Sequence, residues 1–187
     1  MTLNINQKII LLFTLSFFMF LTRGSHFLTE FNLPDMSLIL FLSLGFFSSS
    51  VLLFTLLFAL GSFIDFGSAS LDITKAFCLT DGYWGLIPTY AILFYTGQFL
   101  KGKNLTNNFT LYSSLLIVSI TFAFIVSTNT YYLFSGRFGN PSLYDSVMHG
   151  WNYFPGYLLP NVFYGLIFFV FLKVKTSSQF MNRIKSS

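Results

Sequence analysis

Long apolar runs separated by single charged residues recur along the whole sequence, and they limit what this chain can fold into. Hydrophobic residues make up 54% of the 187 residues and charged residues only 9%, whereas a soluble protein has about 25% charged residues. A helix that crosses a membrane needs about 20 mainly apolar residues. We therefore expect an all-α integral membrane protein that forms one domain over residues 1–187.

Six stretches have the composition of a membrane-spanning helix. They cover residues 9–27, 35–47, 51–65, 83–100, 108–131 and 153–174. The second stretch is short, which predicts a helix that tilts little, thins the bilayer or extends into the serines at 48–50. Pro160 predicts a kink inside the sixth.

The charged residues separate between the two sides of such a six-helix bundle. With a cytoplasmic N-terminus, the outer side receives all six acidic residues, and it receives only three of the ten basic residues, which are Arg23, Lys75 and Arg137. This distribution follows the positive-inside rule, so we expect six transmembrane helices with both termini cytoplasmic. The basic residues form no continuous face, and we expect no nucleic-acid partner.

The outer connections bring together five candidate site residues: His26, Asp65, Cys78, Tyr83 and Arg137. Cys78 is the only cysteine, which excludes an internal disulfide. It suits either a buried small apolar residue or a thiolate ligand for a late first-row metal. His26 suits either an anchor at the membrane interface or the imidazole ligand of the same pocket.

The other three candidates also have two interpretations each. Asp65 ends an apolar stretch, where an ionisable residue is a functional candidate, but its carboxylate could simply reach the outer water. Tyr83, like the other outer aromatic residues, fits an interfacial belt or a platform for a flat macrocycle. Arg137 is either a solvated loop charge or a donor to amide or phosphate oxygens.

Several short motifs follow one another in a fixed order. They are RGSHF at 23–27, LPD at 33–35, ID at 64–65, FCLT at 77–80 with Tyr83, FSGRF at 134–138 and YFP at 153–155. In this order they resemble the BtuM family of bacterial cobalamin (vitamin B12) transporters, relatives of the S components of ECF-type vitamin importers. The resemblance runs from the first predicted span to the sixth and covers nearly the whole chain.

The resemblance implies an S-component-like bundle in the bacterial inner membrane that binds cobalamin at its outer face and takes it up. Cys78 matches the family's axial cobalt ligand, and His26, Asp65 and Tyr83 match residues that line the site. Thiolate ligation in the family is linked to loss of cyanide from cyanocobalamin, so decyanation is expected beside transport. Cobinamide, which keeps the corrin ring, is expected as a further ligand.

The sequence also departs from the family pattern. Asp81 and Gly82 stand where a proline follows the Cys-x-Thr motif, which predicts a more flexible or more acidic rim. Asn152 replaces a frequent basic residue. The first span lacks the small-residue face by which S components dock the energising module, which favours a chain that works without an ECF ATPase module.

Two other functions stay open at this point. The chain could be a membrane thiol enzyme, either an oxidoreductase or a cobalamin decyanase, although no second cysteine is present to resolve a mixed disulfide. It could also be an S-component-like binder of another vitamin.

Overall fold

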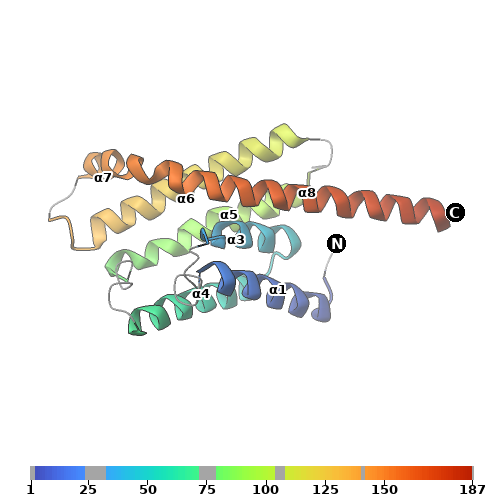
Figure 1. The fold of residues 1–187 in the computed structure, drawn as a ribbon, viewed down its shortest axis with the longest axis horizontal. Helices are drawn as coiled ribbons and strands as arrows, with labels where there is room; N and C mark the ends of the chain where they lie inside the picture. Colours follow the sequence, from blue (N-terminus) through green and yellow to red (C-terminus); the bar gives the residue numbers. More distant parts are fainter. Residues whose placement is uncertain (1–2, 24–32, 72–78, 104–107, 140–141, 187) are drawn as a thin grey trace.

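The computed structural model describes residues 3–23, 33–71, 79–103, 108–139 and 142–186 of the chain. Every regular element in these ranges is a helix, which confirms the all-α prediction. The six main helices lie roughly along one long axis and alternate in direction (Figure 1). They are α1 (Ile5–Arg23), α3 (Ser37–Phe47), α4 (Val51–Leu71), α5 (Leu86–Lys101), α6 (Phe109–Phe134) and α8 (Phe154–Ser186).

Four stretches are long and apolar enough to cross a membrane. They are α1, α4, α6 and the stretch Leu143–Val174, which includes most of α8. The chain is therefore a multi-pass membrane protein by length and composition. The other two main helices are shorter: α3 has 11 residues and α5 has 16, which is about 16 and 24 Å of helix against a hydrocarbon core of about 30 Å.

Helix α3 occupies the interior of the bundle. Nine of its 11 residues, from Ser37 to Gly45, are buried, and it packs against α1, α4, α5 and α8. It ends at Phe47 because Ser48 has an extended backbone, with φ −141° and ψ 127°. The helix therefore does not extend into the serines at 48–50, and its neighbours separate it from lipid.

The closest contact in the bundle joins α3 to α5. A Cβ on Gly45 of α3 would overlap the backbone carbonyl of Phe94 in α5, and a Cβ on Gly97 would overlap the carbonyl of Leu42. Only glycine allows two helix backbones to approach this closely. Farther along the contact, the rings of Phe41 and Tyr90 stack with their centroids 4.4 Å apart.

Both chain termini lie at the same end of the bundle (Figure 1). The C-terminal ends of α1, α4 and α6 gather at the opposite end, and the connections beside those ends carry the described acidic residues Asp35, Asp81 and Asp145. This arrangement agrees with the separation of charges in the sequence. We call this second end the acidic end.

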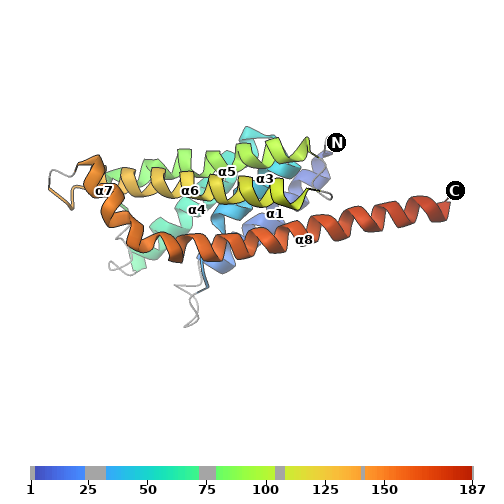
Figure 2. The ribbon, with the colours of Figure 1, turned by 90° about the horizontal axis from the view of Figure 1, so that it is seen from above.

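Four elements at the acidic end differ from the sequence expectation. Helix α4 continues to Leu71, six residues beyond the predicted end of its span, so Asp65 lies within a helix. The segment predicted as a polar connection forms α7 (Leu143–Gly150) and the 3-10 turn η4 (Trp151–Tyr153). Another 3-10 turn, η2 (Asp81–Gly85), leads into α5. Figure 2 shows α7 running across the end of the bundle before the chain turns into α8.

Candidate functional site

Arg23, the last residue of α1, is the centre of a polar cluster at the acidic end. Its side chain is only 12% exposed. The guanidinium donates two hydrogen bonds to the Asp65 carboxylate in α4, from Nε to Oδ1 at 2.6 Å and from Nη2 to Oδ2 at 2.5 Å. Paired hydrogen bonds of this kind are the strong form of an arginine–carboxylate contact, so α1 and α4 are joined here.

Three further groups surround the same guanidinium. Its Nη1 donates to Ser37 Oγ of α3 at 3.0 Å and to the Tyr90 hydroxyl of α5 at 2.5 Å. The Asp35 Oδ2 atom lies 3.5 Å from that nitrogen. A buried cation needs paired charges and hydrogen-bond acceptors, and two carboxylates with two hydroxyl groups supply them. One side chain thus contacts four helices, counting its own.

Tyr83 approaches the Asp65 carboxylate from η2. Its hydroxyl donates to Asp65 Oδ2 at 2.8 Å and lies 3.3 Å from Ser62 Oγ. Asp65 accordingly accepts three hydrogen bonds, and its side chain is 19% exposed. The two predicted site residues Asp65 and Tyr83 are therefore in direct contact. The Asp65 carboxylate is bonded to protein groups, and part of it is also exposed to solvent.

The turn η2 positions Tyr83 because its two glycines lie against α6. Gly82 and Gly85 are both buried. A Cβ on Gly82 would come within 2.6 Å of the Thr130 carbonyl oxygen, and one on Gly85 would overlap the Thr130 side chain. Gly82 therefore serves close packing, which differs from the flexible rim expected from the sequence, and Asp81 is exposed. An acidic rim of a ligand site stays a prediction.

Two of the five predicted site residues, His26 and Cys78, lie outside the residues that the structure describes. Their roles as ligands therefore stay predictions. The described residues nearest to Cys78 in sequence include Thr80, whose buried Oγ1 has no hydrogen-bond partner among the described residues. A buried hydroxyl without a partner is uncommon, so this oxygen is open to a further polar group.

Arg137 lies three residues beyond the end of α6, in the connection to α7, and its side chain is exposed. The end of α6 packs against η2, so Arg137 is at the acidic end. The groups that bond Asp65 are Arg23 and Tyr83, however, and Arg137 is not among them. Its role as a donor to a ligand stays a prediction.

Within the described ranges, no three His, Cys, Asp or Glu side chains gather closely enough to hold a metal ion. The cluster consists of a guanidinium, carboxylates and hydroxyl groups, and such groups position helices and make hydrogen bonds to a ligand. No protein-family model and no curated protein sequence matches the chain.

The central member of the cluster, Arg23, was not among the residues that the sequence analysis selected, and neither were Ser37 and Tyr90. A signal for Arg23 was present, because it is one of three basic residues that the charge distribution leaves on the outer side. An ionisable residue at the end of an apolar span generally has a partner and a role. Ser37 and Tyr90 gave no comparable signal, since each lies in an ordinary apolar helix sequence.

Proposed function

We propose that the chain is an uptake transporter of the bacterial inner membrane that binds cobalamin at its outer face, with the Cys78 thiolate as the axial ligand of the corrin cobalt. The observation that carries the proposal is the Asp65–Tyr83 pair, which Arg23 fixes at the acidic end. In the sequence, Cys78 is five residues before Tyr83, and His26 is three residues after Arg23.

The length of the chain limits how far the two candidate metal ligands can be from described residues at the acidic end. Cys78 is two residues from Thr80, and His26 is three residues from Arg23. An extended chain spans at most about 3.6 Å per residue, so the corresponding Cα atoms are within about 7 and 11 Å of each other. A thiolate and an imidazole in one region suit a late first-row metal such as cobalt.

The proposed chemistry at cobalt is an exchange of axial ligands. The Cys78 thiolate supplies the electron pair of a new cobalt–sulfur bond, and cyanide leaves with the electron pair of the cobalt–carbon bond. The oxidation state of cobalt is unchanged, and one cyanide is released for each protein molecule. Asp65 and the Tyr83 oxygen accept from the amide N–H groups of the ligand, and Arg137 donates to its amide and phosphate oxygens.

We further propose that the transporter works without an ECF energising module. The outward surface of α1 carries large side chains, including Ile9, Phe13 and Phe17, which are 60%, 75% and 54% exposed. Close docking of another helical subunit favours small residues at the contact. The large residues on α1 suit contact with lipid acyl chains instead.

The test is the absorbance spectrum of the purified protein mixed with hydroxocobalamin. We expect the native protein to bind it and to shift the corrin bands, and we expect Cys78→Ala to lose the shift. A second variant is His26→Ala, and its matched control is His149→Ala. The chain has only these two histidines. His149 lies on α7, where its Nδ1 contacts the Asp145 carbonyl oxygen at 3.0 Å.

Two results would contradict the proposal. A spectrum and affinity unchanged in Cys78→Ala would remove the thiolate as ligand. Failure of cobinamide to compete would indicate that the corrin ring is not what the protein recognises. Counting the cyanide released from cyanocobalamin separates the transporter from a decyanase, because an enzyme releases many molecules per protein and a ligand exchange releases one.

A further inference from the structure

Helix α7 and the turn η4 carry large apolar side chains that the described helices leave largely exposed. These side chains are between 40% and 70% exposed, and they belong to Leu143, Tyr144, Val147, Met148 and Trp151. We call this set the α7 apolar surface. Contiguous exposed apolar patches are rare on a protein face that contacts water, and they mark a surface that binds something apolar.

The side chains of α7 divide into three faces. Ser146 and Gly150, the two buried residues, face α6, and a Cβ on Gly150 would come within 2.6 Å of the Thr128 side chain. Asp145 and His149 are one turn apart and form a polar edge. The α7 apolar surface fills the remaining arc of about 140° at 3.6 residues per turn. The three faces of the helix thus suit three environments: the buried face packs on protein, the polar edge suits water, and the α7 apolar surface suits an apolar phase.

The position of α7 fits the boundary where those three environments meet. It crosses the acidic end of the bundle instead of following the long axis (Figure 2). Its first turn is closed by a capping box, in which Ser142 and Asp145 exchange hydrogen bonds, so the helix begins at a defined residue. A helix with one apolar and one polar face that lies in the plane of the membrane interface buries its apolar face at the boundary between headgroups and acyl chains.

The α7 apolar surface also continues into the exposed apolar face of α6. Ile125 of α6 lies beside Val147 and Trp151, and together they line a hollow of about 50 Å³ between the two helices. Farther along α6, Phe122 and Val118 are 58% and 52% exposed. The surface that α6 presents to lipid therefore extends without interruption onto α7.

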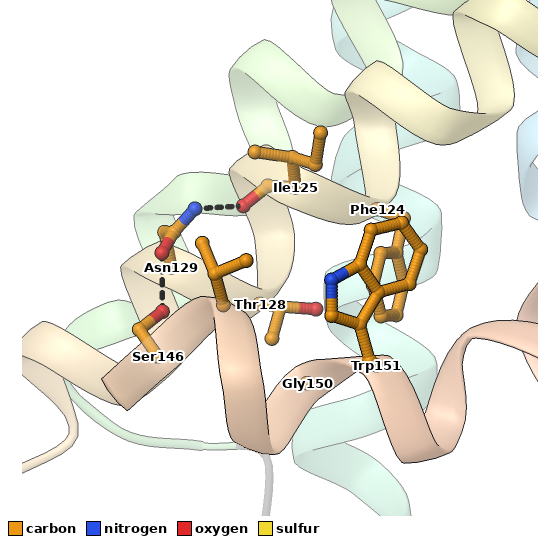
Figure 3. A pocket seen from close by; sticks show the side chains of 8 residues that line it. Phe124, Ile125, Thr128, Asn129, Ser146, Gly150 and Trp151 are labelled. Carbon is orange, nitrogen blue, oxygen red and sulfur yellow. Dashed lines mark hydrogen bonds between the residues drawn. The ribbon is translucent and has the colours of Figure 1, made fainter. Parts of the chain in front are cut away.

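The hollow itself favours apolar contents. Figure 3 shows that the Ser146 hydroxyl is bonded to Asn129, whose amide in turn donates to the Ile125 carbonyl at 2.8 Å. The lining is almost entirely apolar, and the groups of Ser146 and Asn129 are bonded to one another. This leaves the Thr128 hydroxyl and the Trp151 indole N–H as partners for a trapped water, which needs two to four. At about 50 Å³ the space is also far below the 300–1,000 Å³ of ordinary ligand pockets, so it suits part of an acyl chain.

We propose that α7 and η4 form an interfacial helix that inserts the α7 apolar surface into the outer leaflet of the bilayer, at the boundary between headgroups and acyl chains. Tyrosine and tryptophan prefer this depth because their rings are apolar and their tips polar, and Tyr144 and Trp151 supply both. This inference concerns lipid and is independent of which ligand the protein binds.

Depth-dependent quenching of tryptophan fluorescence tests the proposal. The chain has two tryptophans, so Trp84→Phe leaves Trp151 as the only one. This variant is reconstituted into phosphatidylcholine vesicles that carry bromine either near the headgroup or near the end of the acyl chain. We expect blue-shifted emission, stronger quenching by the shallow bromines than by the deep ones, and little quenching by acrylamide in the water.

Each other outcome overturns the proposal. Strong quenching by acrylamide alone would place Trp151 in water, and stronger quenching by the deep bromines would place it within a membrane span. Quenching by neither would mean that protein, such as a second copy of the chain, covers the surface. The quenching of Trp151 is also obtained by subtracting the signal of Trp151→Phe from that of the native protein, so the test does not depend on the folding of Trp84→Phe.

Discussion

At the scale of single residues, Arg23 determines how the acidic end is held together. Its guanidinium bonds Asp65 of α4, Ser37 of α3 and Tyr90 of α5. A charge that is 12% exposed within a membrane bundle is stable only while its partners remain. The loss of stability caused by a substitution in this cluster therefore depends on which charged partners remain.

We predict that Arg23→Met destabilises the protein by about 3–5 kcal/mol, because it leaves the largely buried Asp65 carboxylate without its cation. Removal of both charges in Arg23→Met/Asp65→Leu is expected to cost less than the sum of the two single variants, since neither the Asp65 carboxylate nor the Arg23 guanidinium is then left without the other. Thermal unfolding of the detergent-solubilised single and double variants measures this coupling.

Additive effects in that cycle would contradict the role given to Arg23. They would mean that the pair contributes nothing beyond its separate side chains. The Arg23→Lys variant distinguishes charge from geometry, because an ammonium keeps the charge but cannot make two parallel hydrogen bonds to one carboxylate. It is expected to be intermediate in stability between the native protein and Arg23→Met.

At the scale of elements, the contact of α3 with α5 depends on glycine. We predict that Gly45→Ala destabilises the protein by about 1–3 kcal/mol, the usual cost of overpacking, because the added Cβ overlaps the Phe94 backbone and a backbone cannot rotate away. Gly67→Ala in α4 is the matched control, since a Cβ there meets nothing within 4 Å. Alanine suits a helix better than glycine does, so the control is expected to be neutral or more stable.

The measurement is the thermal or denaturant midpoint of each variant in the same detergent. Equal losses in Gly45→Ala and Gly67→Ala would show that the α3–α5 contact is looser than the structure has it. Gly97→Ala provides a second variant on the other side of the contact, where the obstacle is the Leu42 carbonyl.

Some elements could be predicted from the sequence and others could not, for physical reasons. The ranges of the main helices follow from apolar runs, because a membrane-embedded helix has to be apolar over its length. Helix α7 was missed because it is only eight residues long and exposes its apolar side chains. Its signal was the Ser142-x-x-Asp145 spacing, which is typical of a helix start.

The polar cluster could be predicted only in part for a different reason. Asp65 was selected because a carboxylate beside an apolar run is conspicuous. Its partners Arg23 and Tyr83 are 42 and 18 residues away in the chain, and sequence spacing carries no information about which distant side chains meet. Gly82 was misread as a source of flexibility because the closeness of α6 cannot be inferred from its neighbours in sequence.

At the scale of the whole molecule, the alternating helices predict where each connection lies relative to the membrane. Four stretches are long enough to cross it by themselves, whereas α3 is buried among the others. With 16 residues, α5 is slightly shorter than the about 17–25 residues of a spanning helix. If α3 and α5 also run from one side to the other, the connections near residues 49 and 102 lie on the side of the two termini. Those near Asp81 and Arg137 then lie on the opposite side.

Fusions that end at these four positions and at residue 187 test this arrangement, with alkaline phosphatase as a reporter active outside and green fluorescent protein as one that fluoresces inside. We expect fluorescence at residues 49, 102 and 187 and phosphatase activity at 81 and 137, because basic residues such as Lys101 and Lys103 keep their connection in the cytoplasm. Phosphatase activity at 49 and 102 would mean that α3 and α5 do not cross. The acidic end would then not be a separate outer face, and a cobalamin site there would lack access from outside.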